Sequence, residues 1–284
     1  MHTIIELFSY DFFRNAFLAA LLSAVSCGII GTYIVSRRIV FISGGITHAS
    51  FGGIGIGYFL GLNPLLGAAV FSVLSALGIQ FFTQKGRLRE DSSIAIWWSL
   101  GMAVGIIFIY LSPGYAPNLM SYLFGSILTV SSVELILMAV LALGLTAFFA
   151  VMYRPVLYVA FNEEFARATG LPVNRINYML ISLIALTIVL NIRVVGIILI
   201  LSLLTLPQAT ANLFTNDFRR MLFLSVLFAF LGSLSGLLIS FFADIPSGAS
   251  IIFTLVLLFG LLKWVQLLRL RKKKIRGLAS GGKR

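Results

Sequence analysis

The chain has 284 residues, and its 21 Lys and Arg against 9 Asp and Glu give a formal net charge of +12. Only 11% of residues are charged and 60% are hydrophobic, whereas a soluble domain has about 25% charged and about 45–50% apolar residues. A soluble globule cannot bury this much apolar surface, so the composition predicts an all-α polytopic membrane protein. The basic residues separate apolar segments and do not gather on a soluble domain, which excludes nucleic-acid binding. With one cysteine, Cys27, the chain has no disulfide framework or CxxC motif.

Nine apolar runs are candidates for membrane-spanning helices, and we expect eight or nine spans. Two of them stand out. The run 39–61 contains seven glycines, which predicts a broken or tightly packed helix, and the run 176–191 is short, at 16 residues. The nine runs are 14–35, 39–61, 65–83, 93–112, 132–153, 176–191, 194–214, 221–243 and 248–267.

The basic residues predict the orientation of the chain. If every run crosses the bilayer, all but two of the Lys and Arg residues fall on one side, the exceptions being Arg14 and Arg193. Cytoplasmic connections carry the excess of Lys and Arg, so the N-terminus is expected outside and the C-terminus inside the cell. We expect one transmembrane domain over 1–270, with its first run retained as an anchor, and a basic cytoplasmic tail over 271–284. The uncharged segment 113–131 would then be external, as an interfacial or re-entrant segment.

His48 lies about ten residues inside the glycine-rich run. A polar side chain at this depth is costly unless it faces protein or a water-filled path, so His48 is a candidate transit ligand for a metal cation. The alternative is a hydrogen bond to Ser or Thr of a neighbouring helix, with the glycines permitting close packing. No other His, Asp or Glu lies deep in a run, so we expect no permanently bound metal or other cofactor.

Two acidic residues lie at the ends of apolar runs on the outer side. Asp244 opens the segment DIPSGAS, and it either contacts the cation at the external mouth or caps the last helix. Glu134 follows Ser131 and Ser132, a spacing typical of a helix N-cap.

The connection 154–175 predicts a short amphipathic helix on the inner membrane surface. Apolar side chains alternate with polar ones up to Gly170, and Gly170 with Pro172 marks a helix end. Surface helices that bind anionic lipid favour Lys and Arg, whereas this one carries Glu163 and Glu164, which favours a protein partner over lipid. A plain surface linker is the alternative.

Five segments together resemble one family, over about residues 14–267. The chain is similar to the permease subunits of bacterial ABC importers of zinc, manganese or iron. The segments are YIVSRRIVFISGGITHASFGGIGIGYFLGLNP, SYLFGSIL, NEEFARATGLPV, VVGIILILSLLTLPQATA and DIPSGASII, in the family's order and spacing.

The resemblance implies a fold similar to that of the cobalamin and siderophore importers. It also implies two copies of the permease around a translocation path, two cytoplasmic ATPase subunits that hydrolyse ATP, and an external metal-binding protein. The permease itself would then not be an enzyme. His48 would lie on the path of a divalent cation. The connection over about 156–170 would be a coupling helix that docks on the ATPase, through Glu163, Glu164, Phe165, Arg167 and Gly170.

One residue departs from the family pattern. Many members, notably manganese and iron ones, resemble D-x-x-x-H, with an aspartate one helical turn before the histidine, and this chain has Gly44 there. Loss of the hard oxygen ligand favours zinc over manganese.

Two other function classes fit the sequence less well. A secondary transporter or cation channel without an ATPase partner would have acidic residues or an internal repeat within the membrane, and neither is evident. An intramembrane enzyme would need a catalytic pair, and the sequence has no HExxH and no second deeply placed base. The absence of GxxxxGK[ST] agrees with ATP hydrolysis on another subunit.

Overall fold

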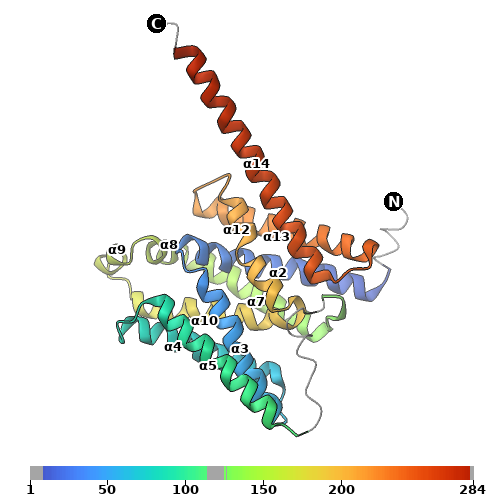
Figure 1. Ribbon diagram of the computed structural model, residues 1–284. Helices are drawn as coiled ribbons and strands as arrows, with labels where there is room; N and C mark the ends of the chain where they lie inside the picture. Colours follow the sequence, from blue (N-terminus) through green and yellow to red (C-terminus); the bar gives the residue numbers. More distant parts are fainter. Residues whose placement is uncertain (1–8, 114–124, 126, 282–284) are drawn as a thin grey trace.

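The structure is a computed structural model that describes residues 9–113, 125 and 127–281, and every regular element in these ranges is a helix (Figure 1). Most of the segment 113–131, including Tyr115, Tyr122 and Phe124, lies outside the described residues. The helices are α2 (Asp11–Ser36), α3 (Phe41–Phe59), α4 (Pro64–Gln84), α5 (Glu90–Leu111), the 3-10 turn η1 (Ile127–Thr129), α7 (Ser132–Val151), α8 (Tyr153–Phe161), α9 (Glu163–Ala168), α10 (Val173–Val195), α11 (Ile197–Leu203), α12 (Leu206–Ala211), α13 (Phe218–Ala243) and α14 (Ser247–Gly281).

Each of the nine apolar runs coincides with helix. Seven helices are long and apolar enough to cross a membrane: α2, α4, α5, α7, α10, α13 and the Ser247–Leu270 part of α14. The run 176–191 belongs to the longer helix α10, of 23 residues. The run 39–61 forms α3, which has 19 residues and is not among these seven helices. The run 194–214 is not one helix, since it forms α11 and α12.

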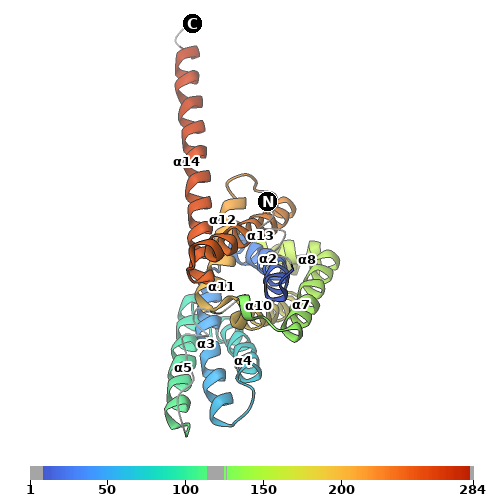
Figure 2. The same cartoon turned by 90° about the vertical axis from the view of Figure 1, so that its right-hand side faces the viewer.

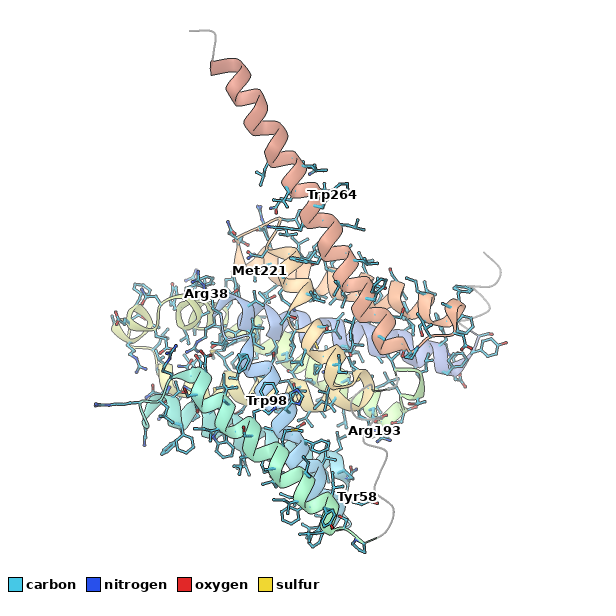
Figure 3. The ribbon with its side chains drawn as sticks, in the orientation of Figure 1. Arg38, Tyr58, Trp98, Arg193, Met221 and Trp264 are labelled. Atoms are coloured by element: carbon cyan, nitrogen blue, oxygen red, sulfur yellow. The ribbon has the colours of Figure 1, made fainter. Side chains whose placement is uncertain are left out.

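The helices connect two opposite ends of the molecule. At the first, the Arg37 end, Arg37 after α2 contacts Glu163 at the start of α9 and Asn177 in the first turns of α10. At the second, the Arg193 end, Arg193 near the end of α10 pairs with Glu134 in the first turn of α7. Figure 3 shows Arg38 at the first end and Tyr58 and Arg193 at the second.

Helix α2 forms the centre of the main helix group. In its apolar window 72% of the residues are buried, compared with 11% in the Ser247–Leu270 window of α14. Helices α7, α10 and α13 pack around α2. Figures 1 and 2 show that the C-terminal part of α14 projects away from this group.

Helices α3, α4 and α5 form a second group, and glycines set its close packing (Figure 2). A Cβ atom at Gly53 would lie 2.0 Å from the carbonyl oxygen of Gly67 on α4. A Cβ at Gly55 would lie 2.4 Å from the carbonyl oxygen of Gly105 on α5. The glycine-rich run is therefore a continuous, tightly packed helix, because side chains larger than hydrogen would separate the backbones.

The break between α11 and α12 has a local cause. Pro207 has no backbone N–H to donate to the carbonyl of Leu203, so a regular helix cannot continue through this point. The Gln208 side chain replaces the missing donor, since its Nε2 donates to the Leu203 carbonyl at 3.1 Å. The same atom donates to the Cys27 carbonyl of α2 at 2.9 Å. The Leu203 carbonyl at the break therefore has a hydrogen-bond donor inside the protein, as irregular backbone at membrane depth requires.

The segment α11–α12 leads from the Arg193 end to the Arg37 end. Gly196, just before α11, packs so closely against Gly125 that a Cβ on Gly125 would lie 2.3 Å from the Gly196 nitrogen. After α12, Phe218 at the start of α13 lies against Tyr153 of α8, with ring centroids 6.1 Å apart. Among the described residues, α11–α12 therefore adds a shorter apolar segment, Ile197–Ala211, to the seven long helices.

Candidate functional site

The connection predicted as one amphipathic helix forms two, α8 and α9, separated by Asn162. The extended backbone of Asn162 ends α8, and the Asn162 side chain caps α9, accepting from the Phe165 backbone N–H at 2.9 Å. Val156 and Val159 of α8 are buried in the core, whereas Phe161 is 61% exposed. The two helices thus lie across the Arg37 end, α8 anchored by apolar side chains and α9 further out.

Helix α9 ends close to Gly170, as predicted from the sequence. Gly170 has φ +79°, a left-handed conformation that costs a residue with a Cβ atom more than glycine. The Gly170 N–H donates to the Arg167 carbonyl and the Leu171 N–H to the Ala166 carbonyl, at 3.0 and 3.1 Å. This pattern ends a helix within one turn, so the chain turns directly into α10.

The residues predicted to dock on an ATPase divide into two groups. Glu164, Phe165 and Arg167 are exposed, Phe165 to 50%. Glu163 instead points toward the protein, where its carboxylate pairs with Arg37 and accepts from Asn177 Nδ2 at 3.0 Å. Arg167 lies 3.7 Å from the second Glu163 oxygen. Glu163 therefore fixes α9 to the body, and only the other side chains are free to meet a partner.

Arg37 is the centre of this network. Its Nη1 donates to the Tyr33 hydroxyl and to Asn177 Oδ1, each at 2.7 Å. Burial lowers the Arg37 pKa, but the Tyr33 hydroxyl and the carboxylates of Glu163 and Glu90 outweigh it, and the pKa lies above its ordinary value. The guanidinium is therefore charged at any physiological pH.

A groove of ≈ 340 Å³ lies beside α9 and opens at the same end. Aromatic rings from α8, α9 and the start of α13 form most of its wall, and Phe161 packs edge-on against Phe218 with ring centroids 6.2 Å apart. It is lined by Tyr153, Leu157, Tyr158, Phe161, Asn162, Phe165, Asn216, Asp217 and Phe218. The exposed face of α9 and this groove make one continuous surface.

His48 lies within the α3–α4–α5 group, where its imidazole stacks on the indole of Trp98 from α5. The ring centroids are 4.4 Å apart and the planes differ by 5°. Figure 3 places Trp98 between the Arg38 end and the end that carries Tyr58 and Arg193. The imidazole is half-buried. Its observed ring contact is thus with an aromatic residue that the sequence analysis did not single out.

Gly44, one turn before His48, has room for a side chain. A Cβ atom there would have Trp98 and Leu201 as nearest neighbours, at 3.6 and 3.8 Å, which is ordinary van der Waals contact. Among the described residues no group of three or more His, Cys, Asp and Glu could hold a metal ion.

The two acidic residues at the Arg193 end differ in role. Glu134 forms the expected capping box with Ser131, whose N–H donates to Glu134 Oε2 at 2.8 Å, and Arg193 Nε lies 3.0 Å from Oε1. Asp244 does not cap the last helix, because α14 begins at Ser247. It ends α13 in the left-handed conformation, at φ 53°, and is exposed.

Sequence reasoning missed Arg37, Asn177 and Trp98 as functional candidates. Arg37 was counted only as a charge that sets orientation. A signal for it was present, since an arginine directly after an apolar helix and an acidic residue in a connection predicted on the same side can pair. Nothing in the sequence marks Trp98 as the neighbour of His48.

Comparison with known proteins agrees with this geometry. The model of the ABC 3 transport family matches residues 9–266. An uncharacterized membrane protein of Synechocystis sp. is 40% identical over 252 residues, covering 89% of this chain and 90% of its own. The manganese transport system membrane protein MntC of Halalkalibacterium halodurans is 36% identical over 256 residues, covering 90% and 88%.

A solved structure is similar over nearly the whole chain. PsaBC from Streptococcus pneumoniae, in complex with Fab, superposes with a TM-score of 0.80 at 30% identity, over 91% of this chain and 95% of that one. The helical fold and these similarities thus define a polytopic permease. The chain belongs to the ABC 3 transport family.

Proposed function

We propose that this chain is the membrane-spanning permease of an ATP-driven importer of a divalent transition-metal cation in a bacterial plasma membrane. The observation that carries the proposal is the exposed face of α9, held at the Arg37 end by Glu163 and continuous with the aromatic groove. A surface of this kind can bind a partner protein that moves α9, as ATPase subunits would. The permease hydrolyses no ATP.

The partners follow from this arrangement and from the family. A second copy of the chain would complete the translocation path, two ATPase subunits would bind at the Arg37 end, and an external metal-binding protein would deliver the cation at the Arg193 end. Asp244, exposed at that end, would meet the arriving cation. Membrane lipid surrounds the exposed apolar side chains of α5, α7 and α14.

The cation belongs to the zinc, manganese and iron class. A relative that is 36% identical is named for manganese transport, and manganese is therefore the first cation to test. Gly44 in place of a carboxylate favours zinc as the second, because imidazole is a good zinc ligand and manganese prefers oxygen.

Transport assays test the proposed function. The chain is purified from its native membranes with its bound subunits, reconstituted into liposomes and supplied with Mn²⁺ or Zn²⁺. ATP enclosed inside the vesicles should drive accumulation of one of these ions, because import requires the ATPase subunits to face the lumen, and a non-hydrolysable ATP analogue should stop it. Accumulation driven by a membrane potential or pH gradient without ATP would instead establish a secondary transporter or channel.

The orientation is a separate proposal, with the Arg37 end in the cytoplasm, the N-terminus outside and the C-terminus inside. Single cysteines in a Cys27→Ser background should react with an impermeant maleimide from outside when placed near Asp244. Cysteines at 85–91 or 271–284 should react only after the cells are opened. Labelling of the Arg87 loop in intact cells contradicts this orientation.

A further inference from the structure

Arg37 lies where three helices meet at the Arg37 end. It directly follows α2, and its guanidinium bonds to α9 through Glu163 and to α10 through Asn177. Asn177 in turn donates to the same Glu163 oxygen that Arg37 binds. The three side chains therefore form a closed triangle of hydrogen bonds, a geometry in which no helix can shift without moving the other two.

Helix α9 has few other attachments. Of its residues only Ala166 is buried. Among the side-chain hydrogen bonds and ion pairs of the described residues, those from α9 to α2 or α10 involve Glu163, or join Arg167 to Asn174 at 3.0 Å. The Arg167 contact is exposed, and exposed ion pairs and bonds contribute little. The attachment through Glu163 is thus the strongest polar one.

The environment of the triangle strengthens it. The Arg37 side chain is 21% exposed and that of Glu163 is 34% exposed, so the pair is shielded from water more than a surface ion pair. Charged hydrogen bonds are the stronger kind, and the planar guanidinium holds several acceptors at once. A lysine at this position has no fixed fork and cannot reproduce the arrangement.

We propose that Arg37 is the positioning residue that transmits movement of α9 to the transmembrane helices α2 and α10. This inference rests on the proposed function, in which an ATPase subunit grips α9. A displacement of α9 pulls on Glu163, and Arg37 and Asn177 carry that displacement to the ends of α2 and α10. Since α2 is the buried centre of the main group and α10 also contacts α3, which carries His48, both helices connect the site of ATP hydrolysis to the membrane path.

The inference is tested with Arg37→Lys, Glu163→Gln and the exchange Arg37→Glu with Glu163→Arg. Each chain is purified with its ATPase subunits and reconstituted, and ions accumulated per ATP hydrolysed are measured with Mn²⁺ and Zn²⁺. Each single substitution should lower this ratio roughly tenfold, within the range of coupling between distant sites. ATPase binding is measured for each variant, and the ratio is compared per bound ATPase, because the exposed face of α9 keeps its own side chains. The exchange should restore part of the ratio.

Three results decide the matter. If the single variants bind the ATPase and keep the original ratio, Arg37 transmits nothing and the inference is wrong. The melting temperature of each variant shows whether it is less stable than the original chain. An exchange variant that regains stability without regaining the ratio also contradicts the inference. If the original chain binds no ATPase, the proposed function fails, independently of Arg37.

Discussion

Replacing Phe165 with Asp is expected to abolish uptake while the chain still folds and inserts. Phe165 is half exposed on α9 and packs edge-on against Tyr158, with ring centroids 5.3 Å apart, so the body of the protein loses little. At an interface, loss of a central aromatic residue typically costs about 2 kcal/mol or more, which corresponds to about 30-fold weaker binding. Binding of the ATPase subunits to the purified chain and uptake into liposomes are the measurements.

A charge substitution in the same helix is a second test of the docking surface. Glu164→Lys should weaken ATPase binding, because Glu164 is exposed and makes none of the contacts that hold Glu163 in place. Asp11→Lys is the matched control, since it changes charge equally at the opposite end, where the Asp11 side chain is 84% exposed. Equal binding of the ATPase to the original chain, Phe165→Asp and Glu164→Lys would show that α9 is not the docking surface.

The second expected effect concerns His48, where stacking on Trp98 allows packing to be separated from metal contact. His48→Phe keeps a flat ring against the indole but removes both nitrogen ligands, whereas His48→Ala removes ring and ligands together. If His48 contacts the cation, both variants should lower uptake at least about tenfold, the least that disturbed metal sites usually lose. His48→Phe should retain the yield and melting temperature of the original chain. Uptake that returns to normal with phenylalanine would make His48 a packing residue.

Gly44→Asp tests the same site by adding a ligand instead of removing one. The structure has space for the new side chain, since its Cβ would meet Trp98 at 3.6 Å. The carboxylate would lie one turn from His48 and add a hard oxygen ligand, so the ratio of Mn²⁺ to Zn²⁺ uptake should rise. The same substitution in the His48→Phe chain is the control, because the oxygen then has no imidazole partner. An unchanged ratio in a folded, active complex would remove this part of α3 from the cation path.

Much of the fold was predictable from local patterns. Helix type and position follow from runs of apolar residues, because an isolated helix satisfies its own backbone and needs only an apolar surface to cross lipid. The capping box of Ser131 and Glu134 and the helix end at Gly170 were predictable for the same reason, since each depends on residues within one or two turns. The expectation for Asp244 was partly wrong because a short polar residue between two helices can end the first or begin the second, and the left-handed turn at Asp244 ends the first.

The site was predictable only in outline. The sequence indicated that 154–175 meets a protein partner, but it grouped Glu163 with Glu164. The structure separates them, because adjacent residues on a helix point about 100° apart and only Glu163 faces Arg37. His48 was similarly recognisable from its depth in the membrane, whereas its stacking partner was not.

The sequence by itself thus determined the class of protein and the nine apolar segments, since hydropathy acts along the chain without regard to its folding. The side of the membrane that carries the basic residues stays a prediction. Only the tertiary structure decided which polar groups meet. Arg37 and Glu163 are separated by 126 positions, and Trp98 lies on a different helix from His48. Such contacts depend on how helices pack, which here is set by glycine-to-glycine approaches and by the break at Pro207. A partly buried charge must find a partner, and the packing determined that the partner of Arg37 is Glu163.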